Sequence, residues 1–316
     1  MSELFCMHLK RDDELTRENL FDYCITHGVL CFGWCFLYRE FGQAEKKMNG
    51  EYKIDSIDSF IEAARDYYLK KESKKTLNHS FDCFRGLKID DLVWTRDPKG
   101  VYYLCRITGK PEHFYNKELD IGAIIKADIF KIGTSVPGVI FHRFSTANSP
   151  TIQRIANEYR ENMLNYSQSL YNERTGTNHY EVRTIKYNLF SLLSGFDLEE
   201  LVIDYLQVNY NYFLSKNSIA FRDTTVNIEC ELFSKIPGEQ PIVVQVKGGN
   251  TGSPKITKEL VPFSLNGKKV FLFFTNENYG VIPNGFTVIG KSELLDFAFK
   301  RKDILPESIK KWIQMC

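Results

Sequence analysis

Alternating apolar and polar positions dominate the first half of the chain. Short runs of this kind are typical of β-strands with one buried face, because successive side chains point to opposite sides of a strand. The pattern predicts strands at residues 29–36, 92–96, 101–108, 121–131 and 138–144. Residues 57–71 instead carry apolar side chains at helical spacing. We therefore expect a small β-barrel interrupted by one helix.

A polar stretch at residues 145–150 ends this region. Apolar residues then recur at helical spacing and predict a helix over residues 151–170. Further on, a predicted helix at residues 197–213 leads into strands at 218–222, 226–233, 242–247, 269–275 and 286–289 and a closing helix that begins at Lys291. These elements predict an N-terminal domain at residues 1–148, a helical linker at 149–184 and an α/β sheet domain at 185–316.

Composition and charge fit an ordinary globular protein. Hydrophobic residues make up 43% of the 316 residues and charged residues 26%. Because 41 basic residues face 40 acidic ones, the net charge is only +1, and any nucleic-acid surface must be a local patch. The N-terminus lacks the apolar core of a secretory signal, and no apolar run reaches the ~20 residues that cross a bilayer. We expect a cytoplasmic protein that does not contact a membrane.

The predicted strand at residues 242–247 carries polar groups on one side. Alternation directs Ile242, Val244 and Val246 to one face, and Gln245 and Lys247 to the other. The preceding predicted strand alternates in the same way, with acids opposite its apolar positions. Two adjacent strands can thus join a carboxylate, an amide oxygen and an ammonium group. This combination suits metal-assisted phosphodiester hydrolysis, because oxygen ligands hold Mg²⁺ while a lysine orients water and offsets phosphate charge.

Two segments carry a resemblance to a known superfamily. Leu-Glu-Glu-Leu-Val at residues 198–202 and Val-Gln-Val-Lys-Gly-Gly at residues 244–249 resemble the leading helix and catalytic strand of PD-(D/E)xK nucleases, in particular Mrr-type restriction endonucleases. The resemblance covers about residues 185–300 and implies a restriction-endonuclease-like α/β domain. It implies that Glu229 and Gln245 bind Mg²⁺, that Lys247 is the catalytic lysine and that Glu199 is the helix acid.

The identity of the metal-binding acid stays open. Glu stands at position 229 where the commoner pattern has Asp, and the Pro-Asp pair is missing, although Asp223 lies just upstream. Glu231 falls on the same predicted strand face as Glu229. The acid is therefore Asp223, Glu229 or Glu231. Acids such as Glu199 are also favoured in the first turn of a helix by its dipole, whatever the function.

The N-terminal domain carries a second resemblance. Residues 28–34, 89–94 and 100–109 resemble EVE and PUA-like barrels, which occur beside nuclease domains and include readers of modified or extruded bases held in an aromatic pocket. Trp34, Trp94, Tyr102 and Tyr103 are the rings that this resemblance assigns to base recognition. A tryptophan on an apolar strand is also a common core residue, so both roles stay open for Trp34 and Trp94.

Local charge adds a candidate phosphate surface. Residues 247–269 contain five lysines and one acid, a net charge of +4, and Lys255 and Lys258 are the candidates for phosphate binding. Lysines scattered along a solvated loop would give the same count.

Together these features predict a Mg²⁺-dependent DNA endonuclease of restriction or phage-defence type, either type II or type IV-like. Its N-terminal domain would select a double-stranded DNA target, modified or not. One site per chain implies a homodimer or a higher homo-oligomer, because cutting both strands takes two sites. Two alternatives stay open: a non-catalytic DNA-binding module with a degenerate nuclease fold, and an RNA-directed defence effector.

Overall fold

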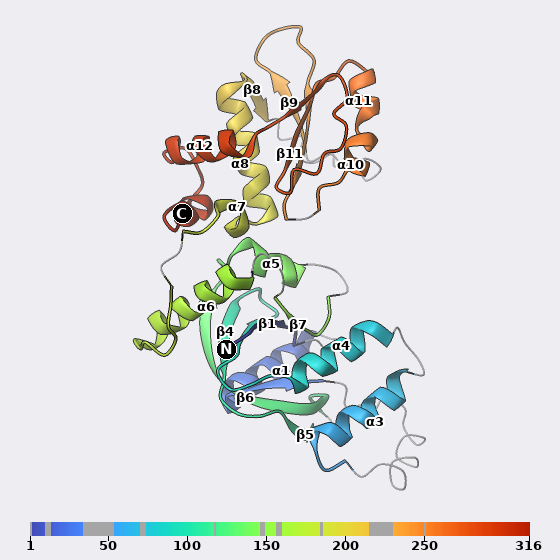
Figure 1. Cartoon of the computed structure of the whole chain (residues 1–316), viewed down its shortest axis with the longest axis vertical. Helices are drawn as coiled ribbons and strands as arrows, with labels where there is room; N and C mark the ends of the chain where they lie inside the picture. The colour runs from blue at the N-terminus through green and yellow to red at the C-terminus, as the bar shows by residue number, and fades with distance from the viewer. Residues whose placement is uncertain are drawn as a thin grey trace. The chain divides into compact units, whose positions relative to one another are not determined.

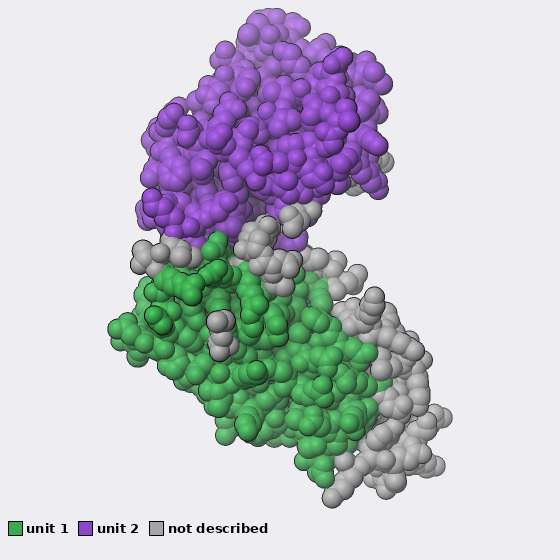
Figure 2. Space-filling model, viewed as in Figure 1, with its two compact units in different colours: residues 1–136, 143–185 green, residues 137–142, 186–316 purple. Residues whose placement is uncertain are grey.

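The computed structural model describes residues 2–9, 14–33, 54–69, 74–116, 118–145, 149–155, 160–183, 186–214, 230–249 and 251–316. The chain forms two compact units, shown in different colours in Figure 2. Unit 1 contains residues 1–136 and 143–185, and unit 2 contains residues 137–142 and 186–316. Each unit has its own sheet and helices, so the chain is a mixed α/β protein.

Unit 1 is built on a curled, half-barrel sheet whose described strands run in the order β2-β6-β4-β3-β1-β7, with β5 also paired to β6 (Figure 1). The long strand β6 holds the sheet together, because its first residues pair with β2 and β5 and its last residues pair with β4. The strands are β1 (Leu4–Met7), β2 (Val29–Phe32), β3 (Leu92–Arg96), β4 (Tyr102–Ile107), β5 (Glu112–Asn116), β6 (Ile121–Gly133) and β7 (Ile152–Arg154).

Helices cover this curled sheet. α3 (Ile57–Leu69) and α4 (Lys74–Arg85) bring Phe60, Phe81 and Phe84 into an apolar core with residues of β1, β2, β4 and β6. Gly122 of β6 is required here, because an added Cβ would lie only 2.4 Å from the Phe60 ring. On β2, the alternate residues Val29 and Cys31 pack against α1 (Glu14–His27). The remaining helices of this region are α5 (Gly138–Ser145), whose first residues belong to unit 2, and α6 (Arg160–Thr175).

Unit 2 contains a five-stranded sheet in the order β12-β11-β10-β9-β8. β9 runs antiparallel to both neighbours, whereas β10, β11 and β12 are mutually parallel. The strands are β8 (Tyr212–Leu214), β9 (Cys230–Ser234), β10 (Ile242–Lys247), β11 (Val270–Phe274) and β12 (Phe286–Val288). The helices are α7 (Leu189–Leu192), α8 (Gly195–Asn209), α10 (Pro254–Glu259), α11 (Val261–Leu265), α12 (Lys291–Lys300) and α13 (Glu307–Ile313).

Two predicted elements of the first half are wrong. Residues 138–144 form helix α5 and not a strand. A short apolar run does not distinguish the two, but Pro137 favours a helix start, and its carbonyl accepts a hydrogen bond from Phe141 N (3.0 Å). The predicted helix at residues 151–170 begins too early, because Ile152–Arg154 is strand β7, which pairs with β1, and helix α6 begins at Arg160.

Residues 149–184, predicted as a linker, contain β7 and α6, and both pack within unit 1. β7 extends the sheet beyond β1, and α6 packs on β1 and β3 through contacts that include a hydrogen bond from Trp94 to Ser167. Across the described ranges of the chain, none of the helices combines the length and hydrophobicity needed to cross a bilayer.

Candidate functional site

The candidate catalytic strand β10 lies between β9 and β11 in the sheet of unit 2. Its antiparallel register with β9 sets Val243 opposite Glu231 and Val244 opposite Cys230. Paired residues of adjacent strands share a face, so Glu231 lies on the same face as Gln245 and Lys247. The predicted adjacency of an acid-bearing strand and the Gln-x-Lys strand is therefore confirmed for the described part of β9.

Gln245 is completely buried, and Lys247, at the end of the strand, is partly exposed. The Gln245 amide Nε2 donates to the Val246 carbonyl (3.2 Å). A buried polar side chain inside an otherwise apolar strand costs free energy unless it is satisfied, so Gln245 is an unusual choice for packing alone.

The backbone that follows Lys247 is tied to the end of β11. The amide of Thr275 donates to the Lys247 carbonyl (2.9 Å), and its hydroxyl donates to the Gly249 carbonyl (2.8 Å). The Thr251 hydroxyl in turn donates to the Gly248 carbonyl (2.7 Å). These bonds fix the direction of the backbone as it leaves the sheet after Lys247. The sequence gives no signal for Thr275, because its partners lie in a different strand.

Helix α8 starts at the same end of the sheet. Ser194 caps the helix in a reciprocal capping box with Asp197. Leu198 lies against Gly248, since a Cβ on that glycine would be 3.5 Å from Leu198 Cδ2. Glu199 follows directly and is partly exposed. The first turns of α8 thus lie at the carboxyl end of β10, and we call Glu199, Gln245 and Lys247 the strand-end site.

Of the three candidate metal-binding acids, only Glu231 falls in the described part of the chain. It forms an ion pair with Lys268, and both side chains are 28% exposed. Asp223 and Glu229 lie outside the described residues, and Glu229 directly precedes the first residue of β9 in sequence. Within the described residues, no cluster of three or more His, Cys, Asp or Glu side chains is arranged to hold a metal ion.

The candidate phosphate-binding lysines lie on the short helix α10. Lys255 is 85% exposed and forms an ion pair with Glu259 (3.7 Å), and Lys258 is also exposed. Lys268 is held by Glu231. The positive charge that the sequence shows between residues 247 and 269 is therefore partly neutralised within the unit.

Asp204 of α8 is an acid that the sequence analysis did not single out. Burial, and then the neighbouring Glu200 carboxylate, raise its pKa from 3.8 to about 6. Burial disfavours the charged form, and a like charge adds to this effect. The spacing of four residues between Glu200 and Asp204 on a helix is the signal that would have brought the pair to attention.

The ring candidates of unit 1 separate into core and surface residues. Trp94 has no exposed surface, and its indole N–H donates to Ser167 Oγ (2.9 Å). Tyr102 is also buried and packs edge to face against Phe144 (centroids 5.5 Å apart). Trp34 lies outside the described residues. Trp94 and Tyr102 are thus core residues in this structure and present no ring face to a base.

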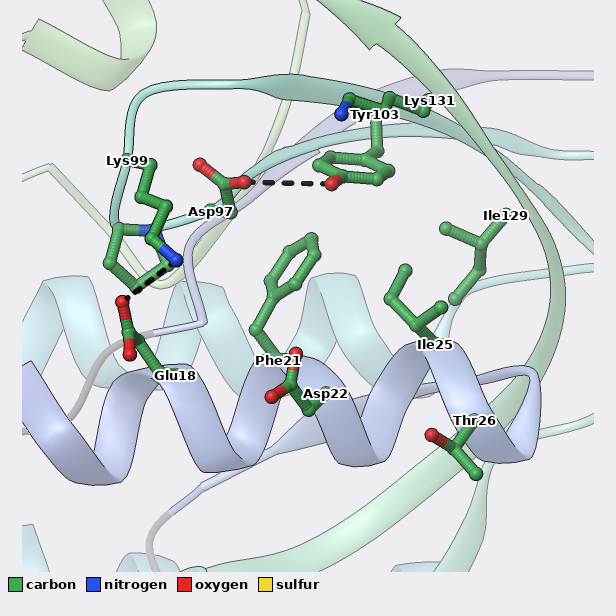
Figure 3. A pocket seen from close by; sticks show the side chains of 11 residues that line it. Glu18, Phe21, Asp22, Ile25, Thr26, Asp97, Lys99, Tyr103, Ile129 and Lys131 are labelled. Atoms are coloured by element: carbon green, nitrogen blue, oxygen red, sulfur yellow. Dashed lines mark hydrogen bonds and ion pairs between the residues drawn. The ribbon is translucent and has the colours of Figure 1, made fainter.

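Tyr103 is partly exposed and lines a pocket of about 720 Å³ beside helix α1 (Figure 3). We call this cavity, formed by residues 18, 21, 22, 25, 26, 97–99, 103, 129 and 131, the Tyr103 pocket. Apart from Tyr103, the sequence analysis did not connect these residues, because they come from four separate segments.

No family model matches the chain, and searches of curated proteins and of solved structures find no match either.

Proposed function

We propose that the chain is a Mg²⁺-dependent DNA endonuclease of restriction or phage-defence type, with its catalytic centre at the strand-end site. The observation that carries the proposal is that Gln245 and Lys247 share one face at the end of a central strand with Glu231 of the neighbouring strand, and that the first turns of α8, which carry Glu199, lie at the same end of that strand. The order of helix, acid strand and Gln-x-Lys strand along the chain is the one that the resemblance to Mrr-type nucleases implies.

The donor set at this end of the sheet fits Mg²⁺. An amide oxygen and carboxylates are hard ligands, which Mg²⁺ prefers, and no soft sulfur ligand is needed. Gln245 and the acid of the β9 segment, with Glu229 as first candidate, would hold the ion, and Glu199 would complete the acidic set. When bound, Mg²⁺ supplies charge stabilisation at the phosphate oxygens. The Lys247 ammonium group orients the attacking water and offsets the negative charge that develops on the phosphate.

Unit 1 selects the target in this proposal, and unit 2 cuts it. Metal chemistry and phosphate contacts carry no base information, so discrimination requires a separate surface that touches bases. Two chains acting as a homodimer would cut the two strands of the duplex.

A second candidate is a non-catalytic DNA-binding module that retains the fold of a nuclease. The observation that favours it is the ion pair between Glu231 and Lys268. This ion pair engages the carboxylate that shares a face of the sheet with Gln245 and Lys247. Metal binding and cleavage separate the two candidates, because the module would bind duplex DNA with the same affinity in the presence and absence of Mg²⁺.

The decisive experiment is cleavage of duplex DNA, modified and unmodified, by Lys247→Ala in the presence of Mg²⁺. Loss of a group that handles protons and charge in the transition state is expected to lower the cleavage rate by about 10³-fold, with the affinity for DNA changed by only a few fold. Lys235→Ala is the matched control, since Lys235 is exposed and follows β9 at the opposite end of the sheet.

Two acid variants complete the test. Glu229→Gln should abolish cleavage, and Glu231→Gln should have the smaller effect. Equal cleavage by Lys247→Ala and wild type would refute the proposal, and cleavage of single-stranded RNA in preference to duplex DNA would favour the RNA-directed effector.

A further inference from the structure

The Tyr103 pocket combines aromatic, acidic and basic groups around one cavity. Its volume, about 720 Å³, falls within the range of small-molecule sites. Phe21 of α1 and Tyr103 of β4 contact each other with ring centroids 4.8 Å apart and planes inclined by 58° (Figure 3). Phe21 is buried and supports the partly exposed Tyr103 ring, which gives the pocket an apolar wall against which a planar ligand can lie.

Carboxylates lie beside this aromatic wall. The Tyr103 hydroxyl donates to Asp97 Oδ2 (3.5 Å), while Asp97 Oδ1 accepts from the Val101 amide (2.8 Å), which fixes the orientation of the carboxylate. Burial, and then Asp97 and Asp22, raise the pKa of Tyr103, so the phenol stays protonated and donates. An ionised carboxylate accepts more hydrogen bonds than one phenol can donate, so acceptor capacity remains for a ligand.

Asp22 has even more of that capacity. It is exposed on α1, and among the described residues it forms neither an ion pair nor a hydrogen bond. A ligand that presents N–H groups next to the rings would meet two carboxylates, Asp22 and Asp97. An anionic group at the same position would be repelled by the two carboxylates.

Two exposed lysines complete the lining of the pocket. Lys99 reaches Glu18 (3.3 Å), and Lys131 lies opposite Tyr103 in the register of β4 with β6. In the described part of the chain, Lys131 has no ion-pair partner. The pocket therefore offers acceptors beside an aromatic wall and ammonium groups on the solvent side. A ligand that matches it has a planar ring with N–H donors and an attached anion.

We propose that the Tyr103 pocket binds one nucleotide, through a base that carries an exocyclic amino group. The amino group of such a base donates to Asp97 and Asp22, the ring lies against Tyr103, and the phosphate lies near Lys131. Thymine and uracil carry a carbonyl oxygen in place of the amino group, and that oxygen faces the carboxylates unfavourably. The nucleotide is either a free molecule or one extruded from a strand, and only the second source rests on the proposed function in DNA cleavage.

The test is calorimetric titration of the full chain with dCMP, dAMP and dGMP, and with dUMP as the control, without metal so that no cleavage can occur. dCMP and dUMP form the closest pair, because dUMP has a carbonyl oxygen where dCMP has the amino group and differs otherwise only in the hydrogen on N3. At least one amino-bearing nucleotide should bind tenfold or more tightly than dUMP. Asp22→Asn should lower that affinity by about tenfold, the effect of losing one charged hydrogen-bond partner.

Glu62→Gln, an exposed acid on α3 that contributes no lining to the pocket, should leave the affinity unchanged. Equal binding of dCMP, dAMP, dGMP and dUMP, no binding at millimolar concentration, or an unchanged affinity in Asp22→Asn would each overturn the proposal. None of these results depends on whether the protein cuts DNA.

A second arm identifies the source of the nucleotide. The Lys247→Ala chain, which is not expected to cut, is titrated with duplexes that hold one mismatched cytosine, where extrusion is easy, or one mismatched thymine. Preference for the cytosine duplex that disappears in Asp22→Asn assigns the pocket to extruded bases. Preference for free dCMP alone assigns it to a free nucleotide.

Discussion

The strand-end site of unit 2 and the Tyr103 pocket of unit 1 place polar groups on different kinds of support. At the strand-end site, Gln245 is fully buried in a strand with neighbours on both sides, and the chain after Lys247 is fixed by Thr275. In the pocket, Asp22 and Lys131 are exposed on the outer side of a helix and a strand. A group that must be held precisely for chemistry gains from the first arrangement. A side chain that selects among ligands can be replaced with less effect on the fold when it is exposed, as in the pocket.

This difference determines how each site can be tested. A truncation at Gln245 would leave a cavity in the sheet, so any loss of activity would be mixed with a loss of stability. Variants of the same size are needed there. Around the Tyr103 pocket, exposed residues such as Asp22 can be changed singly, because their contribution to the packing of unit 1 is small.

The largest effect on stability is expected at Trp94. Replacing this fully buried ring by alanine removes its packing and its hydrogen bond to Ser167 and should lower the free energy of unfolding by about 4 kcal/mol. Urea unfolding measures this loss, and Tyr103→Phe, which removes one long hydrogen bond, serves as the control with a change of less than about 1 kcal/mol. A stable Trp94→Ala protein with altered nucleotide preference would contradict the separation of core and pocket.

The next largest effect is expected for Gln245→Glu. Without metal, a buried carboxylate should cost about 3 kcal/mol of stability, because its charge has no compensating cation. If Gln245 is a metal ligand, millimolar Mg²⁺ should restore the midpoint of thermal unfolding, since the ion neutralises the new charge.

Gln153→Glu is the matched control for this variant. Gln153 is a buried glutamine of unit 1 whose Oε1 accepts from Arg143 (3.0 Å), so its midpoint should not respond to Mg²⁺. An equal response in the two variants, or none in Gln245→Glu, would remove Gln245 from the metal site and favour the non-catalytic module.

In both units the sequence predicts the longer strands and does not predict several of the shorter elements. In unit 2, the predicted strands at residues 242–247, 269–275 and 286–289 agree with β10, β11 and β12 to within one residue at each end. These strands are short apolar runs bounded by turn residues, a pattern that is strong in parallel sheets. In unit 1, β3 agrees with the predicted strand at residues 92–96, whereas β1, β5, α1 and α4 have no predicted counterpart. In unit 2, α7, β8, α10 and α11 have none, and the predicted helix at residues 197–213 is too long, because α8 ends at Asn209 and β8 begins at Tyr212. β1 has only four residues, all buried, and therefore shows no alternation.

The residues of the candidate sites differ in the same way, because a pattern within one strand is visible in the sequence and a contact between distant segments is not. Gln245 and Lys247 stand out because two polar residues interrupt an apolar strand with a period of two. Thr275 and the Tyr103 pocket do not stand out, since their contacts join segments far apart in the chain, such as Phe21 and Tyr103. The spacing of residues along the sequence does not predict such contacts. The alternation at Trp94 predicts a strand, but only the packing of α6 shows that its ring is enclosed.

The smallest of these effects concerns Asp204, a half-buried acid of unit 2. Its pKa is raised to about 6 by burial and by Glu200, so the unfolded chain ionises this carboxyl at lower pH than the folded chain does. Stability should therefore fall as pH rises from about 4 to about 6 and then level off, because ionisation of the folded protein carries the cost. A shift of two pKa units corresponds to about 3 kcal/mol, and solvent around the half-exposed group reduces this to about 1 kcal/mol.

Asp204→Asn should remove this fall and raise the stability at pH 7.5 by that amount, as measured by urea unfolding at pH 4.5, 6 and 7.5. Asp296→Asn, at an exposed site on α12 where the acid pairs with Lys300 (3.6 Å), is the control and should bring no gain. If Asp204→Asn and wild type keep the same difference in stability at all three pH values, the carboxyl does not titrate with a raised pKa, and its environment is more hydrated than the packing of α8 indicates.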